Sequence, residues 1–166
     1  MKVVIQRVSR ASVSSQGSVL GHINHGLLVL IGIQSDDGTD DIEYLCQKIA
    51  QMRLFSDAEG KMNLALNDVQ GECLLVSQFT LMASTAKGNR PSFTLAAPPQ
   101  LALPLYEQFI EKMTTLCFGR VQTGQFGADM QVELINDGPV TILLDSKAKA
   151  QFKNKSIKAL YLPQFL

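Results

Sequence analysis

The chain has 166 residues, 46% of them hydrophobic and 18% charged, and its formal net charge is zero. This composition predicts one globular domain and excludes a disordered or low-complexity chain. No apolar run approaches the roughly 18–20 residues that span a bilayer, and the N-terminal residues do not resemble a signal peptide, so we expect a cytosolic protein with no membrane partner.

The first part of the chain predicts strands. Residues 2–9 and 12–33 are rich in aliphatic and β-branched side chains, and turn signals stand at 16–17 and 24–26. Consecutive strands that are joined by such short turns pair antiparallel. The sequence therefore predicts a β-meander at the N-terminus.

Two helices are predicted by apolar residues that recur at three- and four-residue spacing. Asp40 or Asp41 can cap the first helix, which we expect to end near Arg53. Prolines at 98–99 can open the second, because a proline at the first helical position loses no needed N–H group, and Gly119 is expected to end it. The apolar positions are Ile42, Leu45, Cys46, Ile49 and Met52 in the first helix and Leu101, Leu105, Phe109, Met113 and Leu116 in the second.

Residues 72–79 and 130–136 predict further strands, and residues 140–144 are either a continuation of the second or its partner. The helices lie too far apart in the sequence for a repeated βαβ winding. We therefore predict an α+β fold, in which two main helices pack on a mostly antiparallel, barrel-like sheet.

Charge divides the chain into two parts. Residues 1–145 contain all fifteen acidic residues and ten basic ones, a formal charge of −5, whereas residues 146–166 contain five lysines and no acidic residue. We therefore predict a globular domain over residues 1–145 and a basic C-terminal extension over residues 146–166.

Gly138 and Pro139 interrupt the apolar segment LINDGPVTILL, residues 134–144. Proline cannot donate a hydrogen bond to a β-ladder, and the residue before it is also restricted. The pair therefore predicts a turn, an edge, or a special backbone feature at this point.

Familiar catalytic chemistry is missing from the sequence. His22 and His25 would need a third partner to bind a metal, so we predict two hairpin residues and no metal site. Neither a nucleophile elbow nor a phosphate-binding glycine loop is present. The three cysteines occur singly in apolar surroundings, which favours buried thiols over disulfides.

Three short segments could still carry chemistry. The strand end SQFTL, residues 77–81, is either a satisfied turn or an active site, and Thr80 as a nucleophile would need a base within reach. The loop at 86–93 presents Lys87 and Arg90, which are either solvated or available to phosphates. The segment FGADM, residues 126–130, is either core or the apolar floor of a ligand site.

SQFTL and NDGPVT, residues 136–141, together resemble the paired signature motifs of the D-aminoacyl-tRNA deacylases, also called D-tyrosyl-tRNA deacylases. The resemblance extends to IQRVSRASV, FSDAEGKMN, RPSF and TGQFGADMQV, so it covers essentially residues 1–145. It implies a cytosolic homodimer that hydrolyses the ester between a D-amino acid and the 3′ end of tRNA, with no metal and no organic cofactor.

The resemblance also implies roles for individual residues. In this family the Gly138–Pro139 peptide is cis, and its loop enters the active site of the partner subunit, where main-chain oxygens hold the substrate ammonium group and exclude an L side chain. Glycine has no side chain to exclude, so mischarged glycyl-tRNA is an expected second substrate. Arg7 is expected to support this loop, and Phe126 and Met130 to lie near the terminal adenosine and the amino-acid pocket.

At the strand end, Ser77, Gln78, Phe79 and Thr80 are the expected catalytic residues. The N–H groups of Phe79 and Thr80 would form an oxyanion hole, and Gln78 or the ribose 2′-hydroxyl would position the attacking water. Thr80 as a covalent nucleophile is the competing mechanism.

Two alternatives stay open. A non-catalytic nucleic-acid-binding module on the same fold is the rival function, against which the acidic domain argues because such binding uses a basic face. The five lysines of residues 146–166 would suit tRNA phosphates, or they could belong to a solvated helix that packs on the domain.

Overall fold

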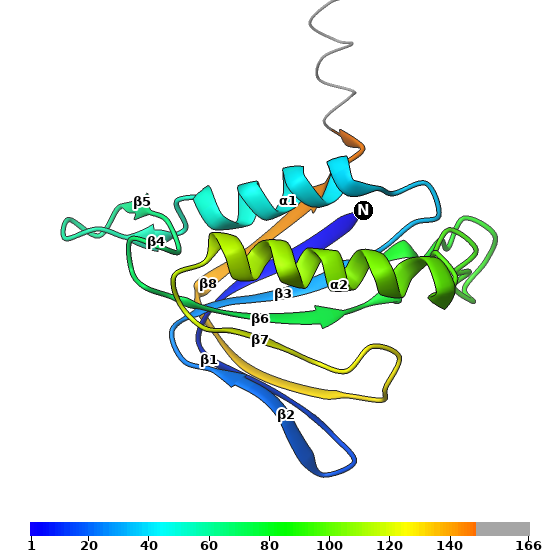
Figure 1. Cartoon of the computed structure of the whole chain (residues 1–166), viewed down its shortest axis with the longest axis horizontal. Coiled ribbons are helices and arrows are strands. Elements are labelled where there is room, and N and C mark those ends of the chain that lie inside the picture. The colour runs from blue at the N-terminus through cyan, green and yellow to red at the C-terminus, as the bar shows by residue number, and fades with distance from the viewer. Residues whose placement is uncertain (149–166) are drawn as a thin grey trace, which may run out of the picture.

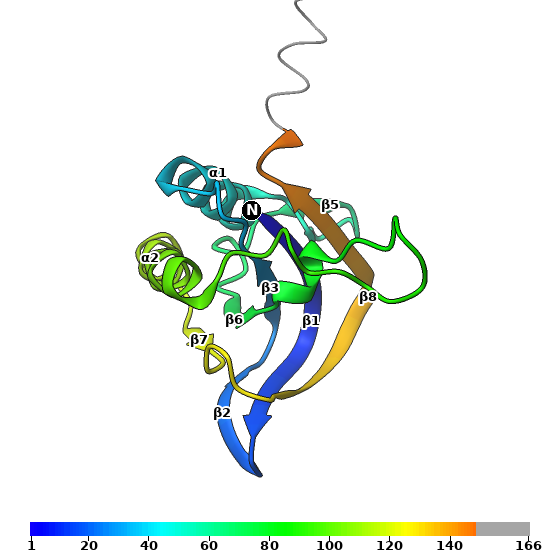
Figure 2. The ribbon, with the colours of Figure 1, turned by 90° about the vertical axis from the view of Figure 1, so that its right-hand side faces the viewer.

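The computed structural model describes residues 1–148, which form a strongly curved sheet with two helices on one side (Figures 1 and 2). The elements in chain order are β1 (Lys2–Ser15), β2 (Ser18–Ile23), β3 (Gly26–Gly32), α1 (Thr39–Gln51), β4 (Phe55–Ser56), β5 (Met62–Leu64), β6 (Glu72–Ser77), the 3₁₀ helix η1 (Phe79–Met82), α2 (Pro99–Leu116), β7 (Val121–Thr123) and β8 (Gln131–Asp145).

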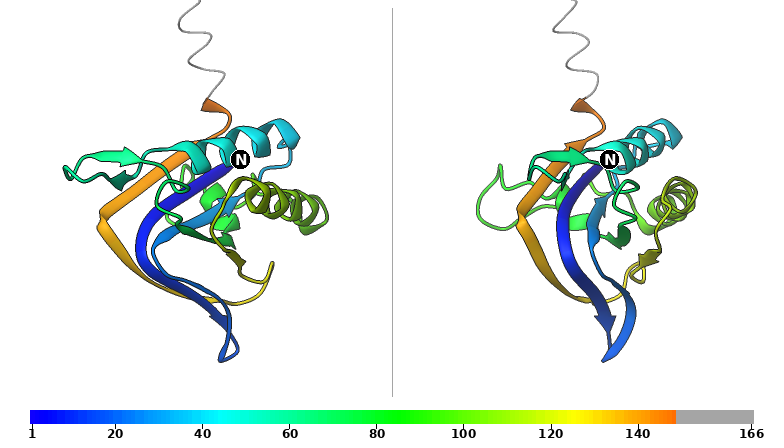
Figure 3. Two further views of the ribbon diagram at one scale, coloured as in Figure 1. Left: turned by 60° about the vertical axis from the view of Figure 1, so that its left-hand side comes forward. Right: turned by 90° about the vertical axis from the view of Figure 1, so that its left-hand side faces the viewer.

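Strand β1 is the centre of the sheet. Its first half pairs antiparallel with β3 and its second half with β2, which confirms the predicted meander. Along its other edge β1 pairs antiparallel with β8, and Figure 3 shows the two strands bending together. Alternate residues of β1 are buried, as expected for a half-buried strand of β-branched residues.

The sheet is mixed, which corrects one part of the predicted fold. Strand β6 pairs parallel with β3, and β7 pairs parallel with β6. Parallel neighbours need a long crossover connection, and here α1 and α2 lie in the two connections. The two helices on a barrel-like sheet are as predicted.

The helices bury their apolar stripes against one face of the sheet. In α1 the buried residues include four of the five predicted positions, and Met52 packs against the same cluster. The N-cap of α1 is Gly38 instead of the predicted Asp40 or Asp41, and the Asp41 carboxylate accepts a hydrogen bond from the Gly38 N–H group at 2.9 Å. A carboxylate in the first turn of a helix is stabilised there by its free N–H groups.

Helix α2 presents a slightly different face from the predicted one. It begins at Pro99 as expected and ends at Leu116, ahead of Gly119. Leu101 is exposed, whereas Tyr106 is buried together with Ala102, Phe109 and Met113. The core therefore includes one aromatic hydroxyl that the sequence pattern did not identify.

The three cysteines are free and buried, which confirms the expectation of thiols. Burial raises the pKa of Cys117 to about 11 and also raises the pKa values of Cys46 and Cys73. Among residues 1–148, no helix is long and apolar enough to cross a membrane. The prediction for the basic extension lies mostly outside the described residues.

Candidate active site

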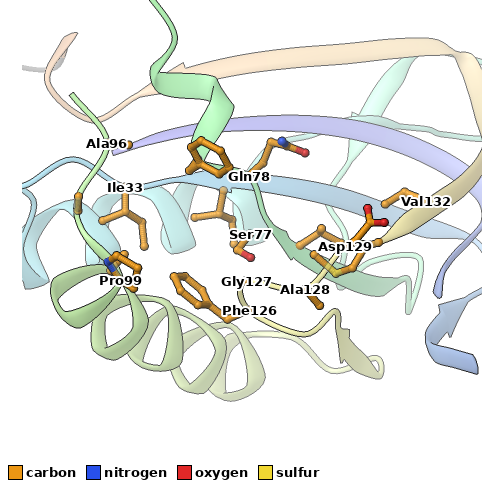
Figure 4. Close-up of a pocket in the computed structure, with 16 residues that line it drawn as sticks. Ile33, Ser77, Gln78, Ala96, Pro99, Phe126, Gly127, Ala128, Asp129 and Val132 are labelled. Atoms are coloured by element: carbon orange, nitrogen blue, oxygen red, sulfur yellow. The ribbon is translucent and has the colours of Figure 1, made fainter. Parts of the chain in front are cut away.

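A pocket of about 540 Å³ lies where the end of β6, the start of α2 and the β7–β8 connection meet (Figure 4). Its apolar wall comes from β3, α2 and Phe126, and Ser77 and Gln78 supply polar side chains. Five of the predicted site residues line it, namely Ser77, Gln78, Phe79, Phe126 and Met130. The structure therefore brings together the SQFTL and FGADM segments, which lie far apart in the sequence.

The strand end SQFTL forms an abrupt change of direction beside this pocket. Strand β6 ends at Ser77 and η1 begins at Phe79, while the Gln78 N–H group donates to the Ile31 carbonyl oxygen at 2.7 Å. The first N–H groups of a helix have no acceptor within the helix, and here they belong to Phe79 and Thr80. No side chain in the described part of the chain caps η1. The strand end thus carries two main-chain donors without a side-chain cap, and Phe79, the first of these residues, lines the pocket.

Thr80 itself does not line the pocket. Its side-chain oxygen accepts a hydrogen bond from the Gln78 amide, with 2.6 Å between Nε2 and Oγ1. An amide N–H group is a donor and cannot remove a proton from the hydroxyl. The group that bonds to the Thr80 hydroxyl is therefore not a general base.

Tyr106 supports both sides of the pocket from α2. Its hydroxyl group donates to the Leu75 carbonyl oxygen at 2.9 Å, and its ring packs against Phe126 with 5.8 Å between ring centroids. Burial raises its pKa, against the opposing effect of a hydrogen bond from the main chain at Ser77, so the hydroxyl stays protonated. Its position three residues before Phe109 on an apolar stripe is the sequence signal that could have identified it.

Asp129 contributes the one acidic side chain that lines the pocket in the described structure. The Ser15 hydroxyl group donates to its carbonyl oxygen at 2.7 Å, which ties the β7–β8 connection to the end of β1. Sequence reasoning assigned the surrounding segment an apolar role and missed this carboxylate. Its polar side chain within FGADM was the available signal.

The Gly138–Pro139 pair lies in a bulge of β8 and does not line the pocket of its own chain. Strand β8 is continuous, so residues 140–144 continue residues 130–136 and do not form their partner. Residues 137–140 have no β1 partner, because Gln6 pairs with Thr141 and Val8 pairs with Asn136. The Gly138–Pro139 peptide bond is cis.

Arg7 holds this bulge from the facing strand. Its side chain is largely buried, with Nη1 at 2.6 Å from the Leu54 carbonyl oxygen and Nε at 3.1 Å from that of Asp137. Gly138 has a φ of +124°, and a Cβ atom there would lie 2.6 Å from Arg7 Nη2. Glycine is the residue that fits this position in both conformation and space.

A second group of contacts closes the bulge at its base. The Asn136 side-chain oxygen accepts a hydrogen bond from the Val140 N–H group at 3.0 Å, and its amide group donates to the Thr141 hydroxyl, also at 3.0 Å. Sequence reasoning used these residues as a motif without assigning them contacts. The bulge is thus held by side chains from both of its ends and from β1.

Among the described residues, neither histidine belongs to a group of side chains that could hold a metal ion. His25 packs edge-on against Phe55, with ring centroids 5.0 Å apart. Within residues 1–148, the structure contains no cluster of three or more His, Cys, Asp or Glu side chains that could hold a metal ion.

Fold and site together define a protein of two helices on a curved, mixed sheet, with a pocket that combines an apolar wall with a strand end. The sequence model of the family described as D-Tyr-tRNA(Tyr) deacylase matches residues 4–145. The chain therefore belongs to this family.

Curated relatives agree with this assignment. A protein of Akkermansia muciniphila named D-aminoacyl-tRNA deacylase is 56% identical over 149 residues, which is 90% of this chain and 99% of the relative. A Porphyromonas gingivalis protein of the same name is 54% identical, with the same coverage. These names confirm the prediction of a deacylase enzyme family.

Solved structures share the fold. One titled c-Myc DNA Unwinding Element Binding Protein is 44% identical, with a TM-score of 0.82 and coverage of 87% of this chain and 98% of that chain. Another, titled as a structural analysis of a probable eukaryotic D-amino acid tRNA deacylase, has a TM-score of 0.74 at 17% identity and the same coverage, and it supports the fold alone.

Proposed function

We propose that this protein hydrolyses the ester bond of D-aminoacyl-tRNA in the cytoplasm and releases the D-amino acid and free tRNA. The observation that carries the proposal is the end of β6, where the N–H groups of Phe79 and Thr80 have no side-chain cap and Phe79 lines an apolar pocket. Ester hydrolysis develops negative charge on the carbonyl oxygen, and main-chain donors stabilise that charge.

The chemistry of the reaction follows from these donors. Water attacks the ester carbonyl carbon, the oxygen becomes an oxyanion held by the two N–H groups, and the ribose oxygen leaves with a proton. One such donor contributes about 10²–10³ in rate. Gln78 lines the pocket and, with the ribose 2′-hydroxyl, is the candidate for positioning the water.

Chiral selection is assigned to the bulge at Gly138 and Pro139 in a second copy of the chain. In its own chain the bulge does not line the pocket, yet Arg7 and Asn136 hold it rigidly. Its main-chain oxygens would bind the substrate ammonium group and exclude an L side chain, while a D side chain points to solvent. Many D-amino acids and glycine would then be accepted, so glycyl-tRNA is a second substrate of the proposed homodimer.

Parallel assays with D-tyrosyl-tRNA, L-tyrosyl-tRNA and glycyl-tRNA test the proposed activity. We expect hydrolysis of the first and third and at least a hundredfold slower hydrolysis of the second. Equal rates with the D and L substrates would contradict the proposed filter, and no hydrolysis of any of them would contradict the function.

Mixed dimers test whether the filter comes from the second copy. Gly138→Ala alters the bulge, and Ala128→Trp fills the pocket, so each homodimer is defective in a different way. A mixed dimer restores one normal site only when pocket and bulge belong to different subunits. Recovery of D-selective hydrolysis on mixing is expected, and a mixture that retains the selectivity of Gly138→Ala alone would disprove the arrangement.

DNA binding is the second candidate, because a 44% identical structure carries a DNA-binding name. The two functions differ in whether they need the pocket. A non-catalytic binding module keeps its DNA affinity when the pocket is filled. Ala128→Trp should therefore abolish hydrolysis and leave DNA affinity unchanged if both activities exist. Hydrolysis without measurable DNA binding would exclude the second function and retain the deacylase function.

The division into a deacylase domain, residues 1–145, and a basic extension, residues 146–166, is also part of the proposal. The extension would add contacts to tRNA phosphates. Removing residues 149–166 and measuring tRNA affinity at several salt concentrations tests this. Lost phosphate contacts would reduce the slope of log affinity against log salt. An unchanged slope would argue for the packed-helix alternative.

A further inference from the structure

We propose that residues 83–95, in the connection between η1 and α2, form a binding surface for the single-stranded 3′ end of RNA outside the pocket. Lys87 and Arg90 contact phosphate groups of the nucleotides that precede the terminal adenosine, and the exposed ring of Phe79 stacks against one of their bases. The inference rests on the proposed function, which places the terminal aminoacyl nucleotide in the pocket.

The two cations are carried on a loop whose base is pinned. Ser84 and Ser92 exchange reciprocal main-chain hydrogen bonds of 2.8 Å each, which closes a hairpin with Lys87 and Arg90 in the segment between them. Figure 2 shows this loop standing away from the sheet beside η1. The charges are therefore presented at a defined place next to the strand end that carries the main-chain donors.

An aromatic contact joins the loop to the site itself. Phe93, just after the hairpin base, packs edge-on against Phe79, with ring centroids 5.1 Å apart and an interplanar angle of 70°. Phe79 is 59% exposed although it is a large apolar residue, and it lines the pocket. Exposed aromatic rings beside cations are the combination that proteins use to bind single-stranded nucleic acid, because every base offers a face for stacking.

Half of the other cations in residues 1–145 are paired with a carboxylate, and the cations of this loop are not. Arg7, Lys61, Lys112 and Arg120 each form an ion pair with a carboxylate. Within residues 1–148 no such ion pair involves Lys87 or Arg90, and both residues are exposed. In a domain with a formal charge of −5, two unpaired cations beside the pocket make a local site for a polyanion.

The two ends of the pocket also differ in charge. Figure 4 places Ala96 and Pro99 at one end and Asp129 at the other. Ala96 follows the loop directly in the chain, so the loop joins the pocket at that end, while the carboxylate occupies the opposite end. A phosphate chain is repelled by Asp129 and attracted by the loop, so the RNA leaves the pocket over residues 83–95.

Salt dependence tests the phosphate contacts. Each contact of a single-stranded nucleic acid contributes about 0.7 to the slope of log affinity against log salt. Lys87→Ala/Arg90→Ala should therefore lower the slope for D-tyrosyl-tRNA by about 1.4. The ratio of kcat/KM between the unaltered protein and this variant should then shrink about sevenfold between 50 and 200 mM salt. The measured quantity is kcat/KM at each salt concentration.

A matched variant controls for net charge. Lys48→Ala/Lys61→Ala also removes two positive charges, from the last turn of α1 and from the turn before β5. Figure 1 shows β5 at the opposite end of the molecule from the loop. Its slope should equal that of the unaltered protein. Lys87→Arg/Arg90→Lys should retain the full slope, because it keeps both charges in the loop.

A substrate without phosphates separates this surface from the pocket. For the D-tyrosyl ester of adenosine, the preference for tRNA over the ester, expressed as a ratio of kcat/KM values, should fall in Lys87→Ala/Arg90→Ala. Phe79→Leu keeps the main-chain N–H group but loses the ring, and it should lower kcat/KM for tRNA about tenfold.

Equal salt slopes in the two double alanine variants, or an unchanged preference for tRNA, would overturn the inference. If the unaltered protein hydrolyses neither substrate, the proposed function fails instead. In that case the binding of uncharged tRNA against salt still decides whether residues 83–95 contact phosphates.

Discussion

The side chain of Arg7 bonds twice to Asp137, with Nε at 3.1 Å from its carbonyl oxygen and 3.3 Å from its carboxylate. Arg7 lies on β1 opposite the β8 residues that have no strand partner. One buried cation thus replaces the missing ladder hydrogen bonds of the bulge. The position of the proposed chiral filter depends on it.

Replacing Arg7 should loosen this bulge. Arg7→Met keeps much of the apolar length but leaves the carbonyl groups of Leu54 and Asp137 without their charged donor, so we expect the free energy of unfolding to fall by about 3 kcal/mol. The ratio of D to L hydrolysis should fall at least tenfold. Urea denaturation and the paired tRNA assays measure the two effects.

Gln6→Ala is the matched control for this variant. Gln6 neighbours Arg7, and within residues 1–148 its side chain makes a single hydrogen bond, a long and exposed one of 3.4 Å to the Thr141 hydroxyl. It should change stability by less than about 0.5 kcal/mol and leave the D to L ratio intact. A normal ratio in Arg7→Met would show that the bulge needs no support from β1.

The hydroxyl group and the N–H group at the strand end can be separated by substitution. Thr80→Ala removes the hydroxyl that bonds to Gln78 and should retain kcat within about tenfold, because the N–H donor remains. A loss of several orders of magnitude would instead support Thr80 as a nucleophile.

Removing a main-chain donor should cost more. Phe79→Pro deletes one N–H group at the first position of η1, where proline is tolerated, and Gln78 before it already lies outside the α region, with φ −145° and ψ 82°. Relative to Phe79→Leu, which lacks the ring but keeps the donor, kcat should fall by about 10²–10³. Similar kcat values in the two variants would exclude the Phe79 N–H group from the oxyanion hole.

Gly26 should be the least replaceable glycine of the sheet. It pairs with Glu72 at the start of the parallel β3–β6 ladder, and a Cβ atom there would lie 1.9 Å from the Glu72 carbonyl oxygen. Gly26→Ala should therefore lower the free energy of unfolding by about 3 kcal/mol or more. Gly38→Ser is the control, because that N-cap position is open and serine is a good cap. Equal stability of both variants would show that β3 and β6 can separate at little cost.

Asp41 should give the fold a pH dependence in acid. Partial burial opposes its ionisation, but hydrogen bonds from Ser146, Gly38 and Lys147 outweigh this, so its pKa is lowered from 3.8. A group with a lowered folded pKa stabilises above its unfolded pKa, about 3.9, and loses that contribution as the pH falls through the folded value. Asp41→Asn should therefore lower Tm at pH 7, and the difference in Tm from the unaltered protein should shrink as the pH falls through the lowered pKa of Asp41. A difference in Tm that persists in acid would mean that Asp41 acts through packing alone.

Local pattern determined the helices, the meander and the candidate motifs of this protein. The apolar spacing of α1 and the residues of SQFTL and NDGPVT are short-range features, and hydrophobic burial and backbone geometry act on them directly. The lack of a histidine at the strand end also followed from the sequence alone.

Tertiary structure decided which segments meet. Residues 140–144 continue β8 because both halves of that strand pair with β1. Strand β6 lies parallel to β3 because a long crossover connects them. Neither pairing leaves a trace in a local pattern. The same holds for Tyr106 and Asp129 at the pocket and for the Leu54 carbonyl group at Arg7. Such contacts join residues that are distant along the chain, so only the folded sheet brings them together.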